Sequence, residues 1–307
     1  MSQNPPITLP HPLRPASLIR IVAPSSPFQR DRFVEAKEWI EKQGYQVHHS
    51  KAIFSKEAFL AGSDDHRRME LEEALEDFDC HALFLARGGY GLMRLFHPKP
   101  LAMRNLNQKI IMGMSDHTPL LNYIAFHLGL VTVHGPVLAG SLFEAISKSQ
   151  KMKLFDQLET AQEKIIKKFQ VVRPGMASAR LWGGNLRMIQ STLSTCLEIP
   201  FREGILFLED LAEEPYQVDR MLCQLAMAGK FENLRGLIFG DLTDRAGKQI
   251  SSALIQRWMD RFVSQDIPIF RGVRIGHHHM EALLPIGGKI RMDSQSQEIV
   301  ISPLVQS

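Results

Sequence analysis

Three separate stretches of the sequence carry side chains that could work together in acyl transfer. Ser115 follows an apolar run and directly precedes a helical pattern. Glu209 and Asp210 follow a second apolar run, 204–208, and three consecutive histidines stand at 277–279. A serine nucleophile, a histidine base and a carboxylate that orients the histidine are the groups of a serine hydrolase. These stretches are therefore the first candidates for a site.

Ser115 is expected at a corner between a strand and a helix. Apolar residues run into it from Ile110, and after Pro119 apolar residues recur at three- and four-residue spacing. At such a corner, free backbone N–H groups and the positive end of the helix can stabilise an anion. Asp116 or Thr118 could cap the same helix. A serine before a helix is often only a cap, so this stretch alone leaves both roles open.

The neighbours Asp116 and His117 do not complete a catalytic triad with Ser115. Side chains of three successive residues point in different directions and cannot form a relay. The base must therefore come from elsewhere, and the histidines at 277–279 are candidates. In an extended segment only His277 and His279 would share a face. We expect no metal there, because no cysteine or acid stands at a ligand spacing and H-E-x-x-H is absent.

The glycine-rich stretch 87–91 (Arg-Gly-Gly-Tyr-Gly) also follows an apolar run. It lacks the Lys-Ser/Thr pair of a phosphate-binding loop. Glycines let a backbone N–H approach a reacting atom closely, so an oxyanion-hole donor is the better functional interpretation. A plain turn remains an alternative. For Glu209, the alternative to orienting a histidine is an exposed loop acid.

The elements that must position these residues follow from the order of the patterns. In the first half, strand patterns alternate with helical patterns, which predicts a parallel sheet covered by helices. Ligands bind at the carboxyl ends of such strands, where residues 87–91, Ser115 and residues 134–136 stand. The second half mixes both patterns and ends in an expected hairpin over 289–301. We predict an N-terminal α/β domain over 1–145, a linker over 146–170 and a smaller β-rich domain over 171–307.

Composition excludes several classes of protein. The chain has 307 residues with 36 basic and 33 acidic side chains, so it lacks the excess charge of a nucleic-acid binder. No apolar run approaches roughly 18 residues, and the N-terminus has no signal-peptide pattern, so no membrane association is expected. Three widely spaced cysteines form no disulfide framework and are expected to be buried thiols. We expect a cytoplasmic protein.

The combination of these motifs resembles the LD-carboxypeptidases, or murein tetrapeptide carboxypeptidases, a family of serine peptidases. The related immunity hydrolases that cleave peptide–nucleotide antibiotics belong to the same family. The resemblance extends from about residue 18 to residue 300, with its motifs in the family's order. The matching stretches are residues 61–64, 87–91, 113–116, 134–136, 183–186, 206–210, 215–216, 219–220, 276–277 and 285–287.

The resemblance implies a role for each matching residue. Ser115 matches the nucleophile, Glu209 the acid and His277 the general base, with His279 as the second choice for the base. The backbone N–H groups of Gly89 and Asp116 match the oxyanion hole. The family usually has Tyr or a similar residue in place of Met114, which changes packing but removes no reacting group. The implied fold is a flavodoxin-like N-terminal α/β domain and a β-rich C-terminal domain, with the triad assembled between them.

The resemblance also implies the reaction. A cytoplasmic murein tetrapeptide would lose its terminal D-Ala by cleavage of the L,D-peptide bond, in peptidoglycan recycling and without a cofactor or metal. A homodimer is a further expectation. One alternative is an immunity-type amide hydrolase on the same scaffold. Another is a binding protein that has lost catalysis, against which the intact Ser115, Glu209 and His277 argue.

Overall fold

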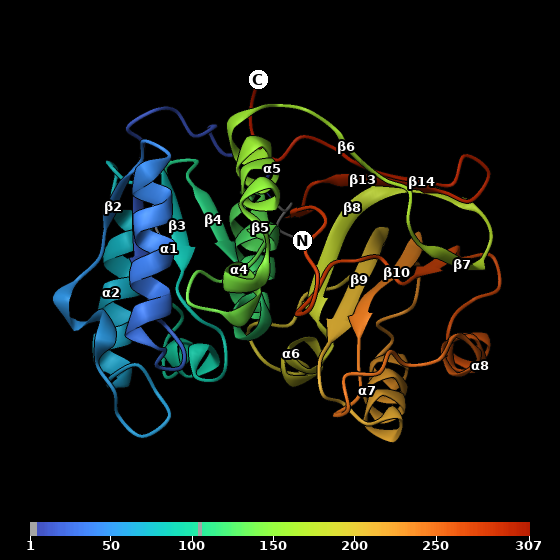
Figure 1. Cartoon of the computed structure of the whole chain (residues 1–307). Helices are drawn as coiled ribbons and strands as arrows, with labels where there is room; N and C mark the ends of the chain where they lie inside the picture. The colour runs from blue at the N-terminus through green and yellow to red at the C-terminus, as the bar shows by residue number, and fades with distance from the viewer. Residues whose placement is uncertain (1–4, 104–105) are drawn as a thin grey trace.

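The computed structural model describes residues 5–103 and 106–307, which form two sheets side by side with helices packed on them (Figure 1). The first sheet has the strand order β12-β5-β4-β3-β1-β2. Strands β1 to β5 are parallel, and their order, 2-1-3-4-5, is that of flavodoxin. Its strands are β1 (Leu18–Val22), β2 (Gln46–His48), β3 (Ala82–Leu85), β4 (Ile110–Gly113), β5 (Thr132–His134) and the antiparallel edge strand β12 (Leu284–Ile286).

Helices connect the parallel strands of this sheet, as the alternating sequence pattern predicts. The fully buried strands β3 and β4 are continuously apolar, which is typical of a parallel sheet covered on both faces. The helical elements are α1 (Arg30–Lys42), α2 (Asp64–Glu76), α3 (Thr118–Tyr123), α4 (Ser141–Ala145) and α5 (Lys148–Glu159), with the 3-10 helices η1 (Lys51–Phe54), η2 (Leu92–Phe96) and η3 (Ser115–His117) and the π-helix η4 (Ile124–Leu128).

The second sheet is mixed and curls around its own core, in the order β6-β14-β13-β8-β9-β10-β11-β7 (Figure 1). Strands β8 to β11 are parallel, and the others pair antiparallel. The elements are β6 (Lys164–Ile166), β7 (Gln170–Arg173), β8 (Met176–Asn185), α6 (Leu186–Ser191), β9 (Gly204–Asp210), α7 (Pro215–Met227), β10 (Gly236–Leu242), α8 (Ser252–Phe262), β11 (Ile269–Arg271), β13 (Lys289–Asp293) and β14 (Glu298–Ile301). The two-part α/β fold class and the C-terminal hairpin are confirmed.

Strand β8 is an element that the sequence patterns do not reveal. Its first half, Met-Ala-Ser-Ala-Arg, is small and polar and carries little strand propensity. This half forms a strand because β13 pairs with it over Met176–Arg180, and β9 pairs with the rest of β8 from Arg180 to Asn185. The helical elements that follow β3 and β8 are short: η2 has five residues and α6 has six.

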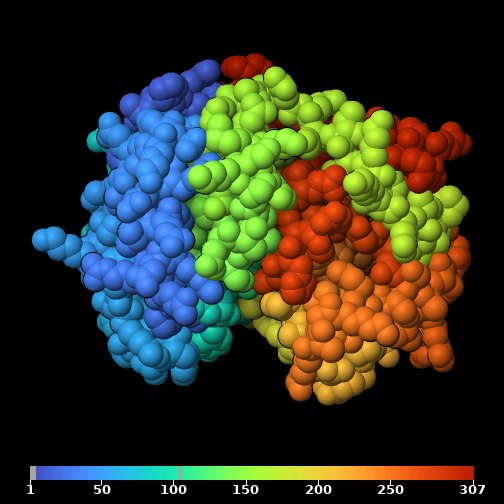
Figure 2. Space-filling model, viewed as in Figure 1, coloured from blue at the N-terminus to red at the C-terminus, as the bar shows by residue number. Residues whose placement is uncertain are grey.

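Residues 146–170, expected as a linker, are divided between the two sheets. Helix α5 packs on the first sheet through Phe155, whose ring lies 6.0 Å from that of Phe84. Strand β6 joins the second sheet beside β14. Conversely, β12 comes from the C-terminal half of the chain and pairs with β5 of the first sheet. Figure 2 shows red C-terminal residues between the green middle segment and the orange second half. That 1–145 and 171–307 behave as separate domains stays a prediction.

The helix lengths and the cysteines can be compared with the expectations from composition. In the ranges that the structure describes, no helix is long and apolar enough to cross a bilayer. All three cysteines are free; Cys80 is buried as expected, whereas Cys196 is exposed and Cys223 is partly exposed.

Candidate active site

Ser115 lies at the corner between β4 and α3, as predicted. It has a φ of +62°, which is unusual for a residue with a side chain and is typical of nucleophiles held on a strained strand-to-helix turn. The loop after β3 lies directly against it. A Cβ added to Gly88 would be 2.8 Å from Ser115 Cβ and 2.9 Å from Ser115 Oγ, so only glycine allows this approach.

The Asp116 side chain has a structural role. Its Oδ2 accepts a hydrogen bond from the Ser25 hydroxyl at 2.6 Å and one from the Leu92 N–H at 2.9 Å. It thereby joins the loops that follow β1, β3 and β4, and it does not cap α3, nor does Thr118. Burial raises the pKa of the Asp116 carboxyl, against these hydrogen bonds. Among the loop and turn contacts of residues 5–103 and 106–307, neither the Gly89 N–H nor the Asp116 N–H donates to a backbone carbonyl.

The motif at 61–64 supports the same loops. Ser63 caps α2 by accepting the His66 N–H at 3.3 Å. Within α2, the buried Arg67 forms an ion pair with Asp64 and donates to the carbonyls of Pro24 and Gly91. One cation therefore joins the loops that follow β1 and β3, which lie beside the Ser115 corner.

Glu209 and His277 meet although they are far apart in the sequence. Glu209 lies near the carboxyl end of β9 and is fully buried, and its Oε2 is 2.7 Å from His277 Nδ1. Burial favours the neutral form of both groups, but their mutual attraction outweighs it. The pKa of His277 is therefore raised and that of Glu209 lowered. This contact leaves His277 Nε2 as the nitrogen that can accept a proton from a nucleophile.

The other two histidines of the run have different partners. His279 Nδ1 lies 2.9 Å from Asp241 Oδ1, and His278 Nε2 lies 3.4 Å from Thr243 Oγ1. Only His277 contacts Glu209, which favours it over His279 as the base. The described residues include no group of three or more His, Cys, Asp or Glu arranged to hold a metal ion.

Direct hydrogen bonds attach the Ser115 corner to the strand beside Glu209. The Asn122 amide of α3 donates to the Gly183 carbonyl at 2.8 Å and accepts the Gly183 N–H at 2.9 Å. Thr118 Oγ1 accepts the Asn185 N–H at 3.1 Å, and Asn185 is paired with Glu209 in the β8–β9 register. The corner and the acid are therefore fixed to neighbouring positions on β8 and β9.

The structure does not join Ser115 to His277. No hydrogen bond between their side chains occurs among the contacts of the described ranges. Catalytic hydrogen bonds of free enzymes are often long and tighten only with substrate bound. The structure thus brings together Glu209 and His277, places the loop 87–91 and Asp116 at the Ser115 corner, and shows no side-chain hydrogen bond between Ser115 and His277 in the described ranges.

His134 is a site residue for which the sequence provided a motif but no role. It ends β5 opposite Gly113, it is fully buried, and its ring centroid lies 5.4 Å from that of Phe207. Phe207 and Glu209 project from the same face of β9, so His134 lies near the Glu209–His277 pair. Burial lowers the pKa of His134 to about 4, so it is neutral at pH 7.

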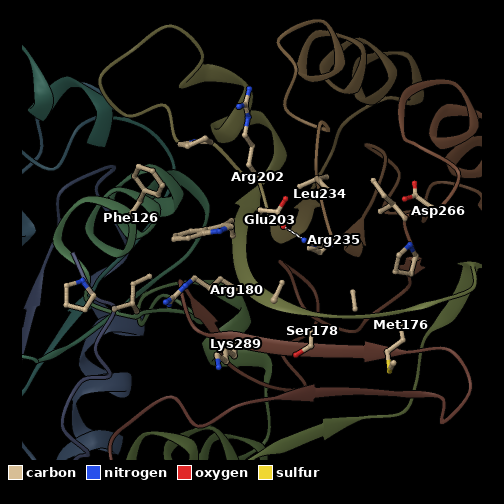
Figure 3. Close-up of a pocket in the computed structure, with 18 of the residues that line it drawn as sticks. Phe126, Met176, Ser178, Arg180, Arg202, Glu203, Leu234, Arg235, Asp266 and Lys289 are labelled. Atoms are coloured by element: carbon tan, nitrogen blue, oxygen red, sulfur yellow. Dashed lines mark hydrogen bonds and ion pairs between the residues drawn. The ribbon is translucent and has the colours of Figure 1, made fainter. Parts of the chain in front are cut away.

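A large cavity of about 950 Å³ lies elsewhere, at the amino ends of β9 and β10 (Figure 3). Its lining includes Arg180, Lys289 and the ion pair between Arg235 and Glu203. Glu203 directly precedes β9 and is six residues before Glu209, which corresponds to roughly 20 Å along the strand direction. None of the five predicted site residues lines this cavity, so it is distinct from the candidate active site.

The buried histidine beside Ser115 predicts a loss of stability in acid. Burial lowers the pKa of His117 from 6.5 to about 3, so between these values the unfolded chain binds a proton that the folded chain does not. The contribution of His117 to the free energy of unfolding is therefore fully present above pH 6.5. It falls as the pH decreases towards 3, by up to about 1.4 kcal/mol per pH unit. Urea unfolding at pH 7, 6 and 5 should show a shallower pH dependence for His117→Leu than for the wild type. Equal slopes would contradict the prediction.

Comparison with known proteins identifies relatives of the whole chain. A profile described as "LD-carboxypeptidase N-terminal domain" matches residues 19–135, and "LD-carboxypeptidase C-terminal domain" matches residues 178–292. The chain is 34% identical to "Probable murein peptide carboxypeptidase" of Bacillus subtilis, over 95% of this chain and 93% of that protein.

Two solved structures have a fold similar to that of this chain. The crystal structure of muramoyltetrapeptide carboxypeptidase from Oxalobacter formigenes has a TM-score of 0.82 and 28% identity, covering 94% of this chain and 100% of that one. The microcin C7 self-immunity protein MccF in complex with aspartyl sulfamoyl adenosine has a TM-score of 0.87 with 22% identity, covering 97% of this chain and 100% of that one. At that identity, the second likeness shows a common fold alone.

Proposed function

The chain belongs to the LD-carboxypeptidase family, and we propose that it is a serine-type hydrolase that releases the terminal D-Ala of murein tetrapeptides. The observation that carries the serine mechanism is the 2.7 Å contact between His277 Nδ1 and buried Glu209 Oε2. Glu209 lies on β9, whose neighbour β8 is hydrogen-bonded to the Ser115 corner. The names of the Bacillus subtilis and Oxalobacter formigenes relatives support the choice of murein peptides.

In the proposed reaction, His277 Nε2 accepts the hydroxyl proton of Ser115 as Oγ attacks the carbonyl of the L,D-peptide bond. The N–H groups of Gly89 and Asp116 stabilise the oxyanion, and Glu209 stabilises the imidazolium. The imidazolium then protonates the leaving amine, so D-Ala departs and the rest of the peptide stays esterified to Ser115. Water, deprotonated by His277, releases the acyl group and restores the hydroxyl.

The substrate assay compares a murein tetrapeptide, the same peptide ending in L-Ala, and a peptide–nucleotide conjugate. We expect D-Ala release from a murein tetrapeptide with a terminal L,D-bond, and no release of L-Ala from the same peptide ending in L-Ala. Activity should persist in the presence of a chelator. The immunity-type alternative predicts cleavage of a peptide–nucleotide conjugate instead. Cleavage of the conjugate with no action on the tetrapeptide would refute the murein proposal, and a requirement for added zinc would refute the serine mechanism.

A cytoplasmic location and a homodimer belong to the same proposal. Three cysteines without a disulfide, one of them exposed, suit a reducing compartment. Fractionation of cells with an antibody to the chain tests the location. Light scattering of the purified protein tests the dimer, and a mass of one chain, 34.8 kDa, would contradict it.

A further inference from the structure

We propose that Asp241 is a positioning residue, which holds the segment 276–279 in place and so sets the His277 ring against Glu209. The inference rests on the proposed role of His277 as the base. Asp241 lies near the carboxyl end of β10, next to β9, and is 3% exposed. It follows an apolar strand as Glu209 does, but the sequence offers no indication of its partners.

The Asp241 carboxylate is fully engaged by the histidine segment. Its Oδ2 accepts the backbone N–H groups of His278 at 3.0 Å and His279 at 2.9 Å. Its Oδ1 lies 2.9 Å from His279 Nδ1 and 3.3 Å from Gln249 Nε2. Two of these bonds fix the backbone immediately after His277. A buried carboxylate with several charge-assisted bonds is a rigid anchor for such a segment.

Gly276 shows how closely the segment must approach the two acids. Its φ is +153°, and an added Cβ would lie 2.6 Å from Asp241 Cβ and 3.1 Å from Glu209 Oε2. The Asp241 N–H also donates to the Ile275 carbonyl at 2.9 Å. The residue before His277 is therefore packed between both carboxylates, and Asp241 binds the chain on both sides of it.

The anchor matters because the segment lies outside the sheet. It follows β11 and is closed by an isolated bridge between Ile275 and Met280. Among the described contacts, the only hydrogen bond of the His277 ring is the one to Glu209. One such bond fixes a distance but not the position of the backbone. Misplacement of a catalytic group by about 1 Å can cost on the order of 10²-fold in rate.

Two substitutions separate the geometric effect of Asp241 from its charge. Asp241→Ala removes all the side-chain bonds to the segment, and kcat for D-Ala release should fall about 10²-fold with a smaller change in KM. Asp241→Asn can still accept both N–H groups through its oxygen, while its amide donates to the other tautomer of His279. Its kcat at high pH should therefore stay much closer to that of the wild type.

The pH profile provides the readout that a merely structural role would not change. The charged and titratable groups that face His277 are Glu209 and Asp210 from β9, Asp241 from β10 and neutral His134 from β5. Loss of the Asp241 charge removes one influence that raises the pKa of His277. The acidic limb of kcat/KM should shift to lower pH in Asp241→Asn.

The matched control is Asp244→Asn, three residues along the chain. Asp244 accepts the N–H groups of Ala246 and Lys248 within an exposed turn, so its pH profile should match the wild type. Thermal unfolding of each variant tests folding. If Asp241→Ala does not fold, the acidic limb of Asp241→Asn still decides the question. An unshifted limb in Asp241→Asn, or wild-type kcat in Asp241→Ala, would overturn the proposal. A wild-type protein inactive on the tetrapeptide would instead refute the proposed function.

Discussion

Replacement of Ser115 by alanine is expected to lower kcat/KM for D-Ala release by about 10⁴-fold or more, because no acyl-enzyme can form without the hydroxyl. Any residual activity would come from binding and from the oxyanion hole. The measurement is steady-state D-Ala release on the alkaline plateau of the wild-type pH profile, where the histidine base is neutral. The same substitution should also abolish labelling of the protein by an organophosphorus reagent that modifies activated serines.

The unusual backbone at Ser115 offers a control for this prediction. Its φ of +62° strains alanine, whereas glycine adopts this conformation readily. Ser115→Gly should therefore unfold at a temperature equal to or above that of Ser115→Ala, while both remain inactive. Activity in either folded variant would show that Ser115 is not the nucleophile, whatever its place at the corner.

Replacement of Glu209 by glutamine is expected to lower kcat by about 10³–10⁴-fold, the scale observed when the acid of a serine triad is replaced by its amide. The amide can hold the imidazole in the wrong tautomer and cannot stabilise the imidazolium. His277→Gln should cost at least as much. The double variant should lose little more than His277→Gln alone, because the members of a catalytic triad act as a unit.

The pH dependence of kcat/KM tests the same pair. The raised pKa of His277 predicts an acidic limb above 6.5, since the base must be neutral to accept the serine proton. In Glu209→Gln that limb should move to lower pH, because the negative charge that raises the pKa of His277 is lost. His279→Gln is the comparison variant, and its loss of kcat should be far smaller than that of His277→Gln. The reverse order would transfer the role of base to His279.

The sequence alone was sufficient to predict the parallel α/β sheet and the order of its elements. Apolar runs of four or five residues, such as Ile110–Gly113, are buried on both faces of a sheet, and this local pattern survives folding. The sequence also singled out Ser115 and Glu209, because each follows an apolar run and the carboxyl ends of strands are where α/β sheets bind ligands. Their types then indicated the chemistry.

The tertiary structure decided which of these groups meet. Residue type alone does not distinguish His277 from His279, and only the family resemblance ranked His277 first. The structure gives the two rings different partners, because β9 and β10 bring Glu209 to one ring and Asp241 to the other. The same limit applies to β8, whose weak local propensity is overcome by pairing with distant strands, and to β12, which returns to the first sheet. Contacts across many residues depend on packing energy summed over the whole fold, which no short stretch of sequence contains.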